Sequence, residues 1–406
     1  MRRAAPLVLC LAACLAAALR PAFADTHSVS YSDWTLSGDT ATLKFILPAT
    51  EAARLTGPAM PLVTVRKLQD YLVENLEVLG DGQTCPAVDQ GYDLGRVDPL
   101  AVGAGFYGFE MFFRCAAGAP KAWVLRDNVL FEEFPAHVNF ARIQVGDRFA
   151  PQLFTSGRQE LRVASAGAPA RAGAGRYFGL GMRHAAHNAW MLALVLGLML
   201  IARRRVELLC LLGGLPIGYA AALGVSLAGW IEPRTALLDA FGAFLVVLVA
   251  AEICAREAYR TRVAAVVGAG LAAIGLLAIA LGRIAPGAVA IGAALLAASF
   301  LTASEDATPR RAFWLAAGAL PGFIDGFVLP AELARLPFGA ADLLPMQVGF
   351  YVGAIATLAL LYAAVTAGAH FLRRRALVPS PALLADVSSA TLAGLGAFWL
   401  LNQLYA

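Results

Sequence analysis

The sequence predicts a polytopic α-helical membrane domain of about eight transmembrane helices, preceded by a small α+β periplasmic domain. Across its 406 residues the chain is 59% hydrophobic and only 15% charged, whereas soluble domains carry about 25% charged residues. The shortfall is concentrated in the second half, where residues after 176 are mostly Ala, Leu, Val and Gly. Apolar runs of about 20 residues, the length that spans a bilayer, recur through that half.

This composition divides the chain into four segments. They are a signal peptide at 1–24, a periplasmic α+β domain at 25–163, a linker at 164–176 rich in Ala, Gly, Pro and Arg, and a helical transmembrane domain at 177–406. The net charge of +4 fits arginines that flank membrane helices, and no basic patch indicates a nucleic-acid partner. The predicted location is the bacterial inner membrane, with the N-terminal domain in the periplasm.

The N-terminus has the three parts of a secretory signal peptide. Arg2 and Arg3 precede an apolar core at 4–19, and small residues before Asp25 end at Ala24. An alternative is a lipoprotein signal that is cut before Cys14. That cut leaves a short apolar core before it and an apolar stretch after it, so cleavage after Ala24 is the preferred interpretation.

Export of the N-terminal domain makes a disulfide the expected state of its cysteines. Cys85 and Cys115 are the two that lie in the predicted periplasmic domain, and thiols in that compartment tend to oxidise. An even pair therefore predicts one bridge; the alternative is two separate buried thiols. Cys210 and Cys254 lie in predicted membrane helices and are expected to be packing residues.

The predicted periplasmic domain is rich in strands and has one helix. Residues 29–36 and 41–47 alternate between apolar and polar around a Ser-Gly-Asp turn, which is typical of a hairpin. Leucines at helical spacing predict an amphipathic helix over 62–79. Further strands are expected at 109–115 and 141–145.

Apolar runs and arginines together predict the membrane topology. Eleven arginines lie in the loops predicted to be cytoplasmic and three in those predicted to be periplasmic, which is the direction of the positive-inside rule. The eleven are Arg203, Arg204, Arg205, Arg256, Arg260, Arg262, Arg310, Arg311, Arg373, Arg374 and Arg375. The eight predicted spans are 178–202, 206–231, 236–255, 263–282, 286–303, 312–333, 344–372 and 384–405.

Several sequence motifs are distributed along most of the chain. Outside the predicted membrane domain they are the stretch from Tyr71-Leu72 to Cys85-Pro86, and His137-Val138-Asn139-Phe140-Ala141-Arg142. In the predicted helices they are Leu180-Gly181-Met182-Arg183-His184, Gly229-Trp230-Ile231, Leu238-Asp239-Ala240 and Gln347-Val348-Gly349-Phe350-Tyr351-Val352-Gly353. Together these motifs resemble the HupE/UreJ family of membrane proteins, the hydrogenase and urease accessory proteins regarded as nickel permeases.

The resemblance also implies metal ligands, and most of their positions hold other residues in this chain. The family has a Gly-x-Asp-His group in its first helix, a His-Ser pair in its second, a glutamate in its third, a later His-Gly pair and a late glutamate. The corresponding residues here are Asn188, Trp190 and Met191 in the first helix, Tyr219-Ala220 in the second, Asp239 in the third, Pro321-Gly322 or with a shift Asp325-Gly326 later, and finally Tyr351.

Ionisable residues inside predicted spans are the candidate site, because charges in a membrane core are costly and usually functional. His184 and His187 are one helical turn apart and share a face. They lie about 9–14 Å below the outer end of their helix, and Asp325 about 12 Å below the outer end of its own. We expect these three to meet as ligands for Ni(II) or Zn(II), with Asp239 and Glu232 nearer the outer surface as entry ligands. Alternatively, the histidines reach the interface and Asp325 pairs with a neighbouring helix.

Two classes of function remain open on the sequence. One is a permease for a divalent transition-metal ion of the nickel type, in which the ion is cargo and no cofactor is expected. The other is a non-transporting membrane scaffold whose periplasmic domain binds a protein partner. An enzyme is not expected, because no paired aspartates and no Ser-His pair at matching depth occur in the spans.

Overall fold

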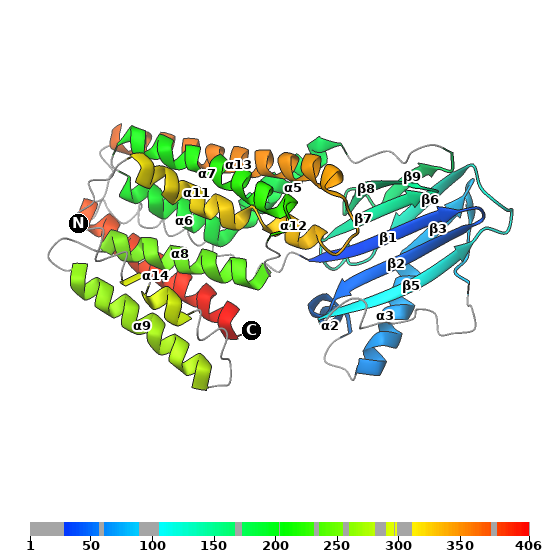
Figure 1. Ribbon diagram of the computed structural model, residues 1–406, viewed down its shortest axis with the longest axis horizontal. Helices are drawn as coiled ribbons and strands as arrows, with labels where there is room; N and C mark the ends of the chain where they lie inside the picture. The colour runs from blue at the N-terminus through cyan, green and yellow to red at the C-terminus, as the bar shows by residue number, and fades with distance from the viewer. Residues whose placement is uncertain are drawn as a thin grey trace. The chain divides into compact units, whose positions relative to one another are not determined.

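The computed structural model describes residues 28–56, 61–88, 105–166, 173–202, 204–230, 235–254, 260–280, 290–295, 297–298, 311–374 and 380–405. They form two compact units (Figure 1). The β unit comprises Thr26–Gly173 and Leu333–Asp342, and the helical unit comprises Ala174–Glu332 and Leu343–Ala406. The predicted signal peptide, the lipoprotein alternative at Cys14 and the entry ligand Glu232 lie outside the described residues, as do residues 167–172 of the linker.

The β unit is built from two sheets that share one core. Sheet A has the strand order β5-β2-β1-β7-β8, and sheet B has the order β4-β3-β6-β9. Neighbouring strands are antiparallel except β1 and β7, which run parallel. The described residues of this unit also form two helices, α2 (Ala49–Thr56) and α3 (Pro61–Asn75), one more than predicted. The strands are β1 Val29–Ser37, β2 Thr40–Pro48, β3 Leu76–Gly80, β4 Gln83–Thr84, β5 Phe106–Arg114, β6 Ala122–Asp127, β7 Val138–Val145, β8 Arg148–Thr155 and β9 Glu160–Ala164.

The predicted hairpin is confirmed, and the predicted helix is too long. Strands β1 and β2 join at a turn in which Gly38 has a φ of 59°, a conformation that favours glycine. The helix over 62–79 ends at Asn75, whose side chain donates to the Tyr71 carbonyl. Leu76 to Gly80 instead form a strand with alternating burial. The two leucines of this strand, Leu76 and Leu79, are three residues apart, which also fits a helix. In the strand they point to opposite faces.

The predicted bridge between Cys85 and Cys115 is confirmed. It joins the two sheets, since Cys85 directly follows β4 and Cys115 directly follows β5. Because β3 and β4 lie between α3 and Cys85, the bridge does not fix that helix to β5. By loop-entropy arguments, closure of a 30-residue separation stabilises a domain by about 3–4 kcal/mol.

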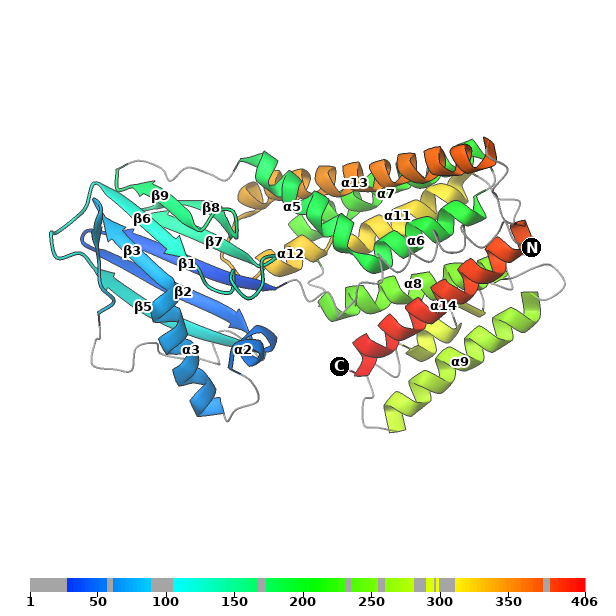
Figure 2. The same ribbon diagram turned by 180° about the vertical axis from the view of Figure 1, so that it is seen from behind.

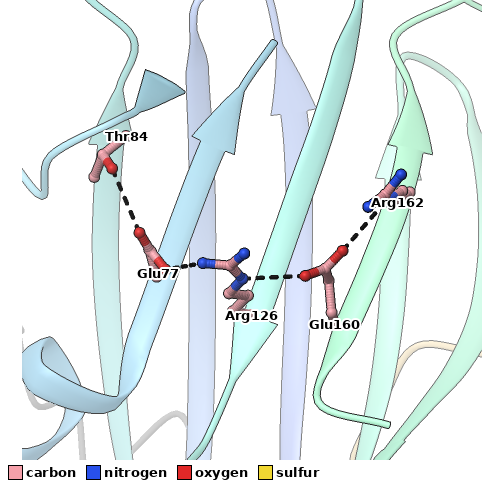
Figure 3. A network of polar contacts seen from close by, with 5 residues as sticks. All are labelled: Glu77, Thr84, Arg126, Glu160 and Arg162. Carbon is pink, nitrogen blue, oxygen red and sulfur yellow. Dashed lines mark hydrogen bonds and ion pairs between the residues drawn. The ribbon is translucent and has the colours of Figure 1, made fainter. Parts of the chain in front are cut away.

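The outward face of sheet B carries a row of ion pairs (Figure 3). Arg126 on β6 contacts Glu77 on β3 at 2.7 Å and Glu160 on β9 at 3.2 Å. Thr84 and Arg162 extend the row at either end. Glu77, Arg126 and Glu160 are partly exposed and Arg162 is largely exposed, and such surface pairs contribute about 0–1 kcal/mol each. The row therefore marks a solvated face and explains little of the stability.

The helical unit contains six helices that are long and apolar enough to cross a membrane among the described residues, or seven if the bent pair α5 and α6 forms one span. Its helices are α5 Ala174–His187, α6 Ala189–Ile201, α7 Arg205–Leu227, α8 Thr235–Cys254, α9 Arg260–Ala280, α11 Arg311–Asp325, α12 Val328–Leu333, α13 Ala340–Arg374 and α14 Pro381–Tyr405. Seven of the eight predicted spans correspond to these elements. Of the predicted span 286–303, only 290–295 and 297–298 are described, and they are helical.

Two predicted spans are broken rather than continuous. The first, 178–202, is divided at Asn188 into α5 and α6, which meet at 68° (Figure 2). The break occurs where the Asn188 side chain caps α6 by accepting from the Met191 backbone N–H at 3.2 Å, a role for which asparagine is well suited. The other, 312–333, is interrupted after Asp325, and a short helix, α12, follows.

Glycines allow two pairs of helices to pack with their backbones in contact. A methyl group on Gly214 or Gly218 of α7 would collide with backbone atoms of α11, and one on Gly181 of α5 with the Phe350 carbonyl of α13. In each pair the contacting residue numbers rise together. Gly214 faces Leu315 and Gly218 faces Ala319, while Ala174 faces Gly349 and Phe178 faces Gly353. Both pairs, α7 with α11 and α5 with α13, therefore run parallel.

We predict that Gly181→Ala destabilises the helical unit, because a Cβ there displaces the backbone of α13. Overpacking of this kind costs about 1–3 kcal/mol. The matched control is Gly179→Ala on the same helix, where nothing lies within 4 Å of an added methyl group. The thermal unfolding midpoint of the full-length protein in detergent should fall for Gly181→Ala and stay constant or rise for Gly179→Ala. Equal midpoints for the two variants would contradict this close approach of α5 and α13.

A second prediction concerns Asp127 at the end of β6, which is fully buried. Its Oδ1 accepts from the Val129 backbone N–H at 3.0 Å, and its Oδ2 has no partner among the described residues. Burial raises the pKa of this carboxyl to about 7. The folded unit therefore keeps a proton that the unfolded chain releases near pH 4. Stability from this residue is complete below about pH 4 and is lost by about pH 7, a change of up to about 4 kcal/mol.

Asp127→Asn should remove this pH dependence. Hydrogen exchange of the β6 amides in the full-length protein, corrected for intrinsic exchange rates, should show protection that falls from pH 5 to pH 7.5 in the wild type and stays level in the variant. Asp147→Asn in the exposed turn between β7 and β8 is the control and should behave like the wild type. A wild-type profile without this decline would refute the assignment.

Candidate functional site

Asp325 is the centre of a polar cluster inside the helical unit. It is the last residue of α11, and it is 1% exposed. Three side chains from other segments approach its two carboxylate oxygens. A carboxylate in such surroundings has lost its water and needs donors in return.

The three donors reach Asp325 from the α5–α6 break and from α7. His184 Nε2 lies 2.9 Å from Oδ1, and the Asn188 amide Nδ2 donates to the same oxygen at 2.8 Å. The Tyr219 hydroxyl donates to Oδ2 at 2.6 Å. Three donors on two oxygens match an ionised carboxylate, to which the imidazole donates from Nε2–H.

Aromatic rings of α13 close one side of this cluster. Tyr351 stacks on Tyr219 with ring centroids 4.7 Å apart, and its hydroxyl donates to the Gly326 carbonyl at 2.6 Å. The Phe350 ring lies 5.1 Å from the imidazole of His184. Tyr351 thus holds the chain directly after Asp325, and the rings of Phe350 and Tyr351 cover one side of the cluster.

The cluster lies where two spans lose their helical hydrogen bonds. Asn188 links the two breaks, because its Oδ1 caps α6 while its Nδ2 donates to the carboxylate at the end of α11. The amino end of a helix carries a partial positive charge that favours an anion. Discontinuous helices of secondary transporters place substrate and ion sites at such points. This arrangement can hold a cation between imidazole and carboxylate, or it can pin the two breaks together.

His184 and Asp325, two of the predicted ligands, are brought together, and His187 does not join them. His187 is exposed, and its Nδ1 lies 2.8 Å from the Arg183 carbonyl of its own helix. Its spacing from His184 predicted that both side chains lie on one helical face. However, α5 ends at His187, and the His187 side chain is exposed while His184 is buried. Asp239 on α8 is partly buried. Among the described residues no group of three His, Cys, Asp or Glu side chains could hold a metal ion.

Three residues that were not predicted as ligands build the cluster around the predicted ligand Asp325. Asn188 and Tyr219 contact its carboxylate, and Tyr351 contacts the carbonyl of the next residue, Gly326. Hydropathy alone gave no signal for the tyrosines, since a tyrosine in an apolar span is usually a packing residue.

A second buried polar cluster lies within the β unit and is fully paired. Burial lowers the pKa of His137 to about 3, so this histidine is neutral. The Ser28 hydroxyl donates to Glu51 and therefore accepts from His137 Nδ1–H. This fixes the tautomer of His137 and the direction of every hydrogen bond in the series. Each group donates to the next in the order Ser32, Asn139, Ser30, His137, Ser28 and Glu51. Every member is satisfied, which indicates a structural role.

Comparison with known proteins gave no assignment. The chain matches no model of a known protein family, and no curated protein sequence matches it. The geometry around Asp325 and the resemblance to HupE/UreJ are the grounds on which a function is proposed.

Proposed function

We propose that this protein is a membrane permease for a divalent transition-metal ion of the nickel type, resembling HupE/UreJ, and that His184 and Asp325 receive the ion. The observation that supports it most is the buried approach of His184 Nε2 to Asp325 Oδ1 at 2.9 Å. Two ligands about 2.1 Å from one ion and at right angles to each other stand about 3 Å apart. An ion can therefore replace the shared proton with little movement of either side chain.

The surroundings of the pair also suit a permeation site. Asn188 and Tyr219 already contact the carboxylate, and the Tyr219 hydroxyl oxygen can become a further ligand when its proton turns away. Asn188 stands at the break between α5 and α6, where backbone carbonyl groups become available to an ion that sheds its water. The proposal does not need His187 and Asp239 as ligands. It keeps His184 and Asp325 as the two strong ligands.

The proposal includes eight crossings in the inner membrane, with a signal peptide and a periplasmic β unit. Parallel packing supports this number. Only α8 and α9 are described as full helices between α7 and α11, and two crossings would leave α7 and α11 antiparallel. A third crossing between α9 and α11, the predicted span 286–303, restores the parallel pair. The same additional crossing is required for α5 and α13 to run parallel. In this region Ala298 lies against Gly268 of α9, 3.3 Å from an added methyl position.

Reporter fusions near Arg204, Arg260, Arg311 and Arg374 should all report the cytoplasm. Arg260 and Arg311 form the decisive pair, because α9 and α11 both start there. Without a crossing between them, the two fusions would report opposite sides. A periplasmic signal at any two of the four positions would rule out the eight-span arrangement.

Metal accumulation is the test of the function. Cells that express His184→Ala or Asp325→Asn should lose the metal accumulation that the wild type confers, measured across several divalent ions. His187→Ala is the matched control, because it removes an exposed imidazole one turn away and should leave accumulation unchanged. Equal amounts of inserted, monodisperse protein must be shown for all variants. Wild-type accumulation in both site variants would contradict the proposal.

A non-transporting scaffold whose β unit binds a protein partner is the second candidate. It is favoured by the complete pairing of Asp325 and by the lack of a third ligand among the described residues. In that case the cluster serves to pin two helix breaks together. Unchanged cellular metal content with and without the wild-type protein, together with loss of folded protein in Asp325→Asn, would favour this function over transport.

A further inference from the structure

A small cavity lies at the amino ends of α7 and α11. Asp325 lies at the opposite, carboxyl end of α11. Its volume is about 150 Å³, enough for a phosphate group and its first waters. Its wall consists of Arg204, Val206, Glu207, Cys210, Arg311 and Trp314. None of these residues belongs to the cluster around Asp325.

The wall carries more positive than negative charge. Arg204 and Arg311 contribute two guanidinium groups, and no ion pair joins either of them to a carboxylate among the described residues. Glu207 contributes one carboxylate, whose Oε2 accepts from the Arg204 backbone N–H at 3.0 Å. Guanidinium groups bind phosphate oxygens in a two-pronged geometry, so the cavity offers two such groups to one anion.

The helix ends add to this potential. Because α7 and α11 run parallel in contact, their amino ends meet at the same place. Arg204 precedes the first residue of α7, and Arg311 is the first residue of α11. Two aligned helix dipoles side by side repel each other, and an anion at their shared amino end relieves that repulsion.

Trp314 supplies an independent indication of a ligand. Its side chain lines the cavity and is 3% exposed, yet its indole Nε1–H has no acceptor among the described residues. Buried indole N–H groups are normally paired. A phosphate or ester oxygen in the cavity would become its acceptor once the indole ring turns toward the cavity.

We propose that this cavity binds a phosphate-bearing anion through Arg204, Arg311 and Trp314. The chemistry is shared by the headgroup of an anionic phospholipid and by free inorganic phosphate. Cavities of this kind, between helices and beside clustered arginines at the cytoplasmic surface, suit lipid headgroups. The site is separate from the proposed ion site, so each can fail without the other.

The test uses the full-length protein purified in detergent and stripped of lipid. Native mass spectrometry measures retention of phosphatidylglycerol against phosphatidylcholine, and thermal unfolding measures the response to inorganic phosphate against chloride. Loss of both guanidinium groups in Arg204→Gln/Arg311→Gln should weaken binding at least about tenfold. Arg374→Gln, at the exposed end of α13 and outside the cavity wall, is the matched control and should bind like the wild type.

Cys210 reports whether the ligand occupies this cavity. The bound anion should slow maleimide labelling of Cys210, which is in the wall, and leave the exposed Cys254 unaffected. Trp314→Phe keeps the ring but removes the N–H, and should weaken binding with no loss of folded protein. Selective retention of phosphatidylglycerol identifies a lipid site, and a response to phosphate alone identifies a free anion. Equal binding by the double variant and Arg374→Gln, or no protection of Cys210, would overturn the proposal.

Discussion

The need to satisfy a buried carboxylate governs the centre of the helical unit. Asp325 is 1% exposed, and leaving such a charge unpaired in an apolar bundle would cost several kcal/mol, on the order of 3–5. The structure answers with one imidazole and one amide from the α5–α6 break and one phenol from α7. The break at Asn188 lets one side chain do two things, because its oxygen caps α6 while its amide nitrogen donates to Asp325.

Close packing of backbones makes this meeting possible. Gly181, Gly214 and Gly218 let α5 and α7 approach their parallel partners without side chains in between. In lipid, where helices gain little from hydrophobic burial, small residues and interhelical hydrogen bonds are the main sources of association. The same parallel pairing brings two amino ends together at the opposite end of α7 and α11. The parallel packing of α7 and α11 therefore brings the residues of the polar cluster together. At the amino ends of the two helices it also forms the cavity proposed to bind an anion.

Residue patterns predicted the division into two units, the pairing of Cys85 with Cys115 though not its place between the sheets, most spans and the proximity of His184 and Asp325. They failed where two periodicities coincide, as in the leucines of 76–79, which fit a helix but form β3. Hydropathy also missed the break at Asn188, because a window of about twenty apolar residues gives no weight to a single residue that ends one helix and caps the next. His187 was grouped with His184 by spacing alone, and spacing holds only while the helix continues. The tyrosines could not have been assigned without knowing which faces of α7 and α13 meet.

The interaction between His184 and Asp325 is the claim on which the site depends, and a double-mutant cycle tests it most directly. The thermal unfolding midpoint in detergent would be measured for His184→Gln, Asp325→Asn and the combined variant, with His187→Gln and Asp325→Asn as the parallel cycle. If the two residues form one buried pair, the combined variant should lose little more than the worse single variant, whereas the parallel cycle should be additive. Additive losses in the His184 cycle would show that the two side chains do not interact, and would contradict a site built on their pairing.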